Sequence, residues 1–134
     1  MIININDLLI KSILDNKHLN VIKFLIENGA NINIKINNEN ILIIVCKNNI
    51  KNINLIQYII DHIDSNLINE YDNNKKKPID YILETEIKSI DLKHLICCLN
   101  KRSQIQDKDT LNKIQNKLNS ITTNEYIQYL GIGC

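Results

Sequence analysis

The chain has 134 residues and a formal net charge of +1, and isoleucine, asparagine and lysine occupy 30, 23 and 15 of its positions. This length suffices for one domain and is short for two. The near balance of 16 basic and 15 acidic residues argues against nucleic acid or an anionic membrane as the partner. The longest apolar runs, such as Ile41 to Cys46, fall far short of the roughly 20 residues of a membrane span. The three dominant residues have A/T-rich codons, so we infer an A/T-rich genome.

The N-terminal stretch and the cysteines indicate the compartment. Asn4, Asn6 and Asp7 interrupt the segment where a secretory signal would be basic and then continuously apolar. The cysteines form no CxxC pair and show no spacing typical of a disulfide scaffold; they are Cys46, Cys97, Cys98 and Cys134. We therefore expect a cytoplasmic protein.

The stretch VIKFLIENGANIN, from Val21 to Asn33, predicts a helix that ends abruptly. Its apolar residues follow the i, i+3, i+4 spacing of a helix face. Gly29 and the single alanine of the chain, Ala30, follow directly. Glycine adopts a positive φ without a Cβ clash, so we expect Gly29 to end this helix with positive φ. At Ala30 we expect a larger side chain to crowd the returning loop.

The apolar pattern of this stretch recurs along the chain. The block Val21, Ile22, Leu25, Ile26 returns 34 residues later as Leu55, Ile56, Ile59, Ile60, and 36 residues after that, less fully, as Leu92, Leu95, Ile96. A shorter apolar run precedes each block: LLIKSIL from Leu8, ILIIVCK from Ile41 and KPIDYIL from Lys77. Each unit is thus predicted to be a helix pair with a polar loop, and such units must stack to bury their apolar faces.

These residues resemble the ankyrin repeat family. VIKFLIENGANIN is similar to the second helix and exit of that repeat, and DNNKKKPIDYIL, from Asp72 to Leu83, resembles its DxxGxTPLHxAA segment. The resemblance covers about residues 4–99 and is strongest in the first unit. In the second unit, IDSNLIN from Ile63 replaces the Gly-Ala exit and is two residues longer. Leu8, Leu9 and Lys11 replace the family's Thr, Pro and His, so we expect a looser first helix.

The resemblance implies an all-α, ankyrin-type solenoid of about three repeats with C-terminal capping helices. The expected ankyrin domain spans residues 1–99, with units at about 4–36, 37–72 and 73–99, and a helical cap spans 100–134. In the cap, Leu111, Ile114, Leu118 and Ile121 share one face of a helix expected to start with Asp109 as its cap. Thr122, Glu125 and Gly131 predict a second short helix. This region serves either as a cap or as a separate docking site.

The family pattern implies a module that binds another protein through its finger loops and its concave helix face. The contact residues expected in the finger loops are Asn37, Asn38, Asn40, Asn73, Asn74 and Lys76. Beside them we expect the outer ends of the first helices to contribute Asp15, Asn16, Asn48, Asn49, Glu84 and Thr85. We expect a monomer that binds neither nucleic acid nor membrane. The alternative is a structural or degenerate helical repeat protein without a selective surface. A small ankyrin chain from an A/T-rich genome is similar to viral host-modulating ankyrin proteins, which would act in the host cytoplasm, or to the ankyrin proteins of A/T-rich protists.

The residues that could carry other chemistry have simpler interpretations. His94, Cys97 and Cys98 have the spacing of a zinc site or a Cys-His nucleophile, but a fourth ligand is missing nearby, and we expect buried packing cysteines. Cys46 lies at the family's small alanine position, and His18 matches the histidine of its turn. Lys75 to Lys77 is expected to be a solvated loop, with an acidic partner as the alternative. We predict no catalytic residues, no metal and no cofactor.

Overall fold

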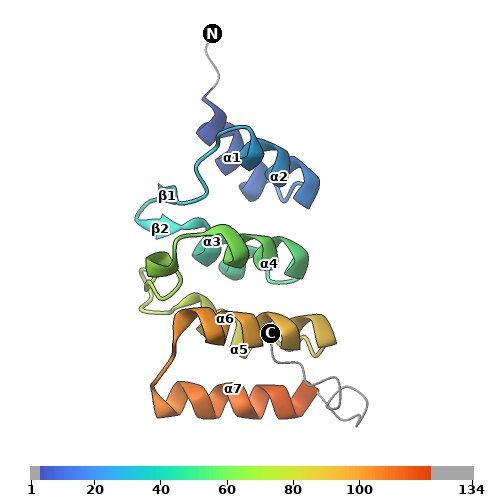
Figure 1. Cartoon of the computed structure of the whole chain (residues 1–134), viewed down its shortest axis with the longest axis vertical. Helices are drawn as coiled ribbons and strands as arrows, with labels where there is room; N and C mark the ends of the chain where they lie inside the picture. The colour runs from blue at the N-terminus through green and yellow to red at the C-terminus, as the bar shows by residue number, and fades with distance from the viewer. Residues whose placement is uncertain (1–3, 122–134) are drawn as a thin grey trace.

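The computed structural model describes residues 4–121, where helix pairs stack along the long axis of the molecule (Figure 1). The first pair is α1 (Ile5–Leu14) and α2 (Leu19–Glu27), the second α3 (Ile41–Asn48) and α4 (Ile53–His62), and the third α5 (Pro78–Glu84) and α6 (Ile90–Ser103). Helix α7 (Lys108–Ile121) packs against α5 and α6 and closes one end of the stack. The predicted all-α helix-pair solenoid is confirmed.

Helix α1 begins three residues before the predicted apolar run and has a cap of its own. The Asn4 side chain accepts a hydrogen bond from the Asn6 amide at 2.9 Å. This bond replaces those that the family's Thr and His would make at the helix start. The His18 ring caps α2 in the same way, because its Nδ1 accepts from the Asn20 amide at 3.1 Å. His18 therefore has the structural role expected from the sequence.

Gly29 ends the first repeat with φ +107°, as the sequence predicted. Its amide donates to the Ile26 carbonyl at 3.2 Å, and the Ala30 amide donates to the Leu25 carbonyl at 3.0 Å. A Cβ added at Gly29 would meet no atom within 4 Å, so the backbone conformation, not space, calls for glycine here. Ala30 follows as a buried residue.

The loop between the first two repeats is a β-hairpin, where the sequence analysis predicted only a polar loop. Strands β1 (Lys35–Ile36) and β2 (Glu39–Asn40) pair antiparallel around Asn37 and Asn38. These two asparagines have φ of 53° and 68°. A two-residue hairpin turn with both central residues at positive φ has type I′ geometry, which asparagine tolerates better than most residues.

The core runs through the centre of the stack. Ile22, Ile56 and Leu92, the equivalent residues of the three repeats, are each 0% exposed. Helix α3 is buried at every position from Ile41 to Cys46, because it lies between neighbours on both sides. Stacking continues from α3 to α5 and from α4 to α6. Burial of this continuous apolar face is the main driving force for the fold.

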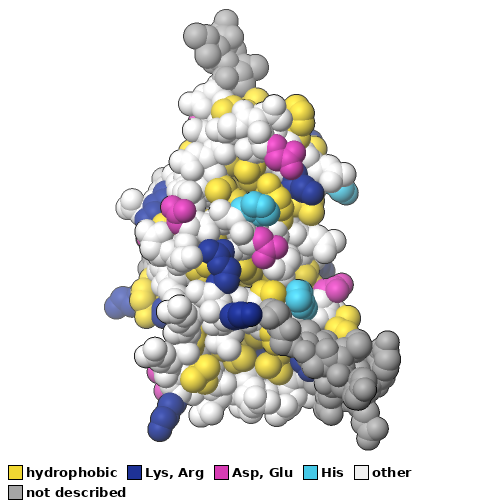
Figure 2. All heavy atoms as spheres, viewed as in Figure 1, with side chains coloured by type: hydrophobic (Ala, Val, Ile, Leu, Met, Phe, Trp, Pro, Cys, Tyr) yellow, Lys and Arg dark blue, Asp and Glu magenta, His cyan; other side chains and the backbone are white. Residues whose placement is uncertain are grey.

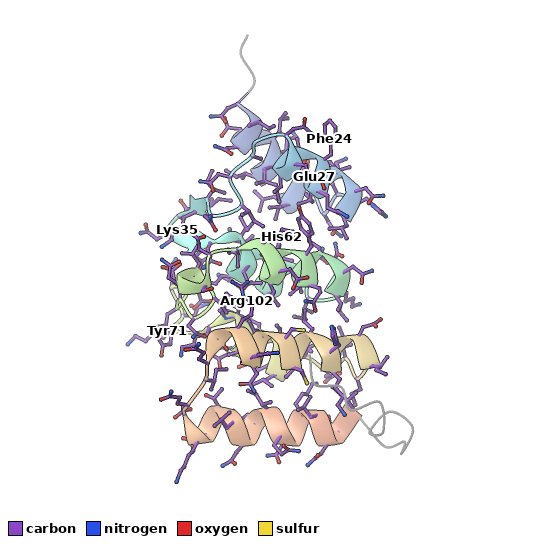
Figure 3. All side chains as sticks on the ribbon, in the orientation of Figure 1. Phe24, Glu27, Lys35, His62, Tyr71 and Arg102 are labelled. Atoms are coloured by element: carbon purple, nitrogen blue, oxygen red, sulfur yellow. The ribbon has the colours of Figure 1, made fainter. Side chains whose placement is uncertain are left out.

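The second repeat ends without a Gly-Ala exit. Helix α4 stops at His62, Ile63 is extended, and a 3₁₀ turn, η1 (Ser65–Leu67), follows. The Arg102 side chain on α6 donates to the Ile60 and Ile63 carbonyls and to Ser65 Oγ, the last two at 3.0 and 2.9 Å. Figure 3 shows Arg102 between α4 and α6. A residue of the next repeat thus satisfies the carbonyls left open at the end of α4.

The C-terminal region differs from the sequence expectation in three ways. Helix α6 runs to Ser103, so the expected boundary between residues 99 and 100 falls inside a continuous helix. Asp107, not Asp109, caps α7, since its Oδ2 accepts from the Thr110 amide at 2.8 Å. Ile114 and Ile121 are buried as expected, but Leu111 is 36% exposed. The second short helix predicted around Thr122, Glu125 and Gly131 lies outside the described residues.

Candidate protein-binding surface

Two finger loops project from the same side of the stack, on the left in Figure 1. The first is the hairpin of residues 35–40, and the second is the loop of residues 72–77 that leads into α5. Asn37, Asn38, Asn73 and Asn74 are exposed at these loops, as predicted. Lys76 is only half-buried and pairs with Glu84 at 2.9 Å.

A buried polar network holds the two finger loops together. The Asp72 side chain is 0% exposed, and its Oδ1 accepts from the Asn74 and Lys76 amides at 2.8 and 2.9 Å. Its Oδ2 accepts from the Tyr81 hydroxyl. Lys47 Nζ lies 3.9 Å from this carboxylate and 3.1 Å from Glu39 of the hairpin.

The same network joins one loop to the other directly. The Asn73 amide donates to Glu39 Oε2 at 3.3 Å. Glu39 is itself 9% exposed, so both carboxylates of the network are almost removed from solvent. Because buried carboxylates need partners, the hairpin and the second loop hold each other in one arrangement.

Burial and the hydrogen bonds of the network shift the pKa of both Asp72 and Tyr81. Burial by itself would raise the pKa of Asp72, but hydrogen bonds from Tyr81 and two backbone amides, with the nearby Lys47 ammonium, hold that pKa below its ordinary value. Burial and the hydrogen bond to Asp72 raise the pKa of Tyr81 to about 12. The pair therefore contains an ionised carboxylate and a protonated phenol at neutral pH.

Asn40 is not a contact residue, and this corrects the sequence prediction. It is 0% exposed and caps α3, because its Oδ1 accepts from the Ile43 amide at 3.0 Å. Its Nδ2 donates to the Leu67 carbonyl at 2.9 Å and to Glu70 Oε1 at 3.0 Å. Glu70 in turn pairs with Lys35 at 2.7 Å. Asn40 fills the helix-capping position and anchors the hairpin to the end of the second repeat.

The remaining predicted contact residues lie at the other side of the stack, near the turns between the first and second helices (Figure 1). These are Asp15, Asn16, Asn48, Asn49, Glu84 and Thr85. They were predicted to lie beside the finger positions, but the length of the first helices, about 12 Å for an eight-residue helix, separates the two groups. Ion pairs span that distance along α3, between Glu39 and Lys47, and along α5, between Lys76 and Glu84. Thr85 is half-buried and has structural partners: its Oγ accepts from the Ile87 amide at 3.4 Å, and its carbonyl accepts from Lys117.

Three of these residues share a pocket between α1 and α3. It has a volume of about 360 Å³ and is lined by Ile13, Leu14, Asn16, Ile44, Val45, Asn48 and Asn49. Asn49 Nδ2 donates to Asn16 Oδ1 across the two repeats. The apolar part of this pocket was not predicted from the sequence. The one signal for it was Leu14, the last apolar residue of LLIKSIL, which is 59% exposed in the structure.

His94, Cys97 and Cys98, considered above for a zinc site or a Cys-His nucleophile, have these surroundings in the structure. Cys98 Sγ lies 3.5 Å from His94 Nε2, and residues 4–121 hold no cluster of metal-binding side chains. Cys97 and Cys98 are half-buried, so the expected burial of this pair is only partial. Cys46 is buried, and burial raises the pKa of its thiol, as suits a packing residue.

The basic run of the second finger loop is more ordered than a solvated loop. Lys75 has φ 63° at the position of the family's glycine, while the Lys76 and Lys77 ammonium groups lie 5.2 and 5.1 Å from the ring centres of Tyr81 and Tyr71. Basic and acidic side chains are interspersed on the face seen in Figure 2. Across residues 4–121, no helix is long and apolar enough to cross a membrane.

Comparison with known proteins agrees with this geometry. A family model for ankyrin repeats in three copies matches residues 9–109. The chain belongs to the ankyrin repeat family. No curated protein and no solved structure matched the chain. Ankyrin repeats are generally protein-protein interaction modules.

Proposed function

We propose that this ankyrin protein binds a partner protein through its finger loops and the adjacent face of its first helices. The observation that carries the proposal is the buried network under the loops. The loops carry three exposed asparagines at their tips: Asn37, Asn38 and Asn73. Contacts among Glu39, Asp72 and Lys47 fix the two loops beneath these side chains. Loops anchored in this way lose little conformational freedom when a partner binds.

The chemistry of the loop tips indicates a polar, uncharged contact. Asparagine side chains offer one acceptor and two donors each and do not impose a sign of charge on the partner. Two of the lysines near them are paired with acidic groups, Lys35 with Glu70 and Lys76 with Glu84, whereas Lys75 is exposed beside Asn74. We propose that the partner is a host cytoplasmic protein, that the chain acts as a monomer, and that its role is viral or host-modulating, in line with the A/T-rich genome inferred from the amino-acid composition.

Photo-crosslinking tests whether the finger loops contact the partner. A photoreactive amino acid at Asn73, which is exposed in the second loop, should crosslink one dominant protein from candidate host cytosol. The matched control position is Asp61 on α4, which is also exposed but lies on a second helix. Crosslinking of the same protein from Asp61 alone would place the contact on the opposite helices and overturn the proposal.

A triple variant then tests the contribution of the loops to affinity. Asn37→Asp, Asn38→Asp and Asn73→Arg change exposed side chains, and aspartate tolerates the positive φ of the hairpin tip. We expect each substitution to change stability by no more than about 0.5 kcal/mol and the affinity for the crosslinked partner to fall by at least about ten-fold. Asn40 is left unchanged, because it caps α3 and anchors the hairpin, and its loss would change stability as well as affinity. Unchanged affinity would instead support a structural repeat protein without a selective surface.

A further inference from the structure

The pocket between α1 and α3 combines an apolar floor with an amide rim. Ile13, Ile44 and Val45 are 6%, 6% and 2% exposed and form the floor, and Leu14, at 59% exposed, forms a wall. Asn16, Asn48 and Asn49 complete the lining, and no charged side chain contributes to it. Binding pockets typically pair apolar walls with a few polar groups that fix the orientation of the ligand.

The amide rim has hydrogen-bonding capacity that the protein does not use. Asn16 Oδ1 accepts from Asn49 Nδ2, which leaves Asn16 Nδ2 as a donor and Asn49 Oδ1 as an acceptor. Within residues 4–121, no hydrogen bond engages either of these two atoms or the Asn48 side chain. One donor beside one acceptor complements the C=O and N–H of a peptide backbone.

The backbone conformation at the end of α1 positions Asn16, and its hydrogen bond to Asn49 is not what places it there. It follows the end of α1 at φ 57°, where its amide donates to the Ile13 carbonyl at 3.1 Å. Asparagine is one of the few residues that tolerate this conformation. The side chain is therefore directed by the helix end toward the neighbouring repeat, and the rim spans two repeats.

We propose that this pocket binds an extended, uncharged segment of the partner protein and takes one aliphatic side chain. The segment's backbone bonds to the Asn16–Asn49 pair, and a leucine-sized side chain covers Leu14 and the floor. The absence of charged lining residues selects against lysine, arginine, aspartate and glutamate at that position, because a charge in the pocket would lose hydration without gaining a counter-ion. This inference rests on the proposed function and names the chemistry of the segment that the partner presents.

Blocked tripeptides provide a test that needs no knowledge of the partner. N-acetyl-Ser-Leu-Ser-N-methylamide is titrated into the full chain, and its binding is followed by NMR shifts of backbone, methyl and side-chain amide groups. The comparison peptides carry alanine, lysine or glutamate in the centre. We expect shifts at Leu14, Ile44, Val45 and the three rim asparagines, and binding of the leucine peptide about ten-fold tighter than that of the alanine peptide. Equal or tighter binding of the lysine or glutamate peptide would overturn the proposal, as would shifts confined to other parts of the chain.

Two variants and a control link the binding to the pocket. Asn16→Gly keeps the positive φ and removes the carboxamide, and Leu14→Ala removes the exposed wall. Each should weaken binding of the leucine peptide about five-fold with an unchanged melting temperature. Gln104→Gly is the matched control, because Gln104 is also exposed at positive φ but lies at the end of α6, away from the pocket and the finger loops. Equal effects of Asn16→Gly and Gln104→Gly would refute the pocket, whereas failure of the finger-loop triple variant to affect partner binding would refute only the proposed function.

Discussion

The Arg102 guanidinium donates to the Ile63 carbonyl at 3.0 Å and so closes the end of a helix that belongs to the preceding repeat. The second repeat lacks the glycine that ends the first, and its longer exit leaves carbonyls that need donors. A guanidinium fork can reach two of them at once. One side chain on α6 thus compensates for a departure from the repeat pattern at α4.

Removing this side chain should destabilise the whole stack. Arg102→Ala leaves the Ile60 and Ile63 carbonyls without their donor, and we expect a loss of about 2 kcal/mol in the free energy of unfolding. Arg102→Lys keeps the charge but not the fork, so it should restore only part of the loss. Chemical denaturation measures both, with the exposed Lys51→Ala as the control. An Arg102→Ala protein as stable as the Lys51→Ala protein would contradict the role assigned to Arg102.

A substitution at Gly29 tests the cost of a positive φ without adding a steric clash. Gly29→Val should lower the free energy of unfolding by about 1 kcal/mol or more, because valine is strained at φ +107°. Space is not the cause, since an added Cβ meets nothing within 4 Å. Asn16→Gly, at another positive-φ position, should by contrast leave stability nearly unchanged. Thermal unfolding of both variants provides the comparison, and an unaltered melting temperature for Gly29→Val would show that the cap is dispensable.

Equivalent residues of the first and second repeats should respond differently to a charge. Val21 and Leu55 occupy the same repeat position, but Val21 is 41% exposed and Leu55 is 1% exposed. The difference arises because no described repeat precedes the first. We expect Leu55→Asp to destabilise by at least about 3 kcal/mol and Val21→Asp by no more than about 0.5 kcal/mol. Similar losses measured for both by denaturant titration would mean that a further element covers Val21.

Stability at acidic pH should depend on Asp72. Its pKa in the folded chain lies below the ordinary value of 3.8, so the folded state binds the proton less tightly than the unfolded state. The contribution of Asp72 is therefore complete above its ordinary pKa and is lost as the pH falls through the lowered folded value. Asp72→Asn should flatten the decline of unfolding free energy in that acidic range. Parallel pH profiles for the variant and the parent would show that other carboxylates cause the acid loss.

Some features of this protein follow from residues that are close in the sequence. Neighbours within about four positions determine the turn at Gly29 after α2, the His18 cap and the start of α5 at Pro78. The 34-residue recurrence of apolar blocks predicted stacked helix pairs, because a single pair cannot bury its apolar face. Periodicity was therefore sufficient to predict a stack of helix pairs, and the ankyrin fold was predicted from the resemblance of VIKFLIENGANIN and DNNKKKPIDYIL to that family's repeat.

Other features depend on contacts between residues far apart in the chain, and the sequence alone did not reveal them. Asn40 was predicted to be a finger-loop contact residue. In the structure its side chain is buried and donates to Leu67 and Glu70, about 30 positions later in the chain. The capping role of Arg102 needs a helix that ends 40 positions earlier, at His62. The α1–α3 pocket needs Asn16 and Asn49 to meet across two repeats. A side chain's partners and exposure are set by which segments stack together, and that pairing is decided only when the whole apolar face is buried.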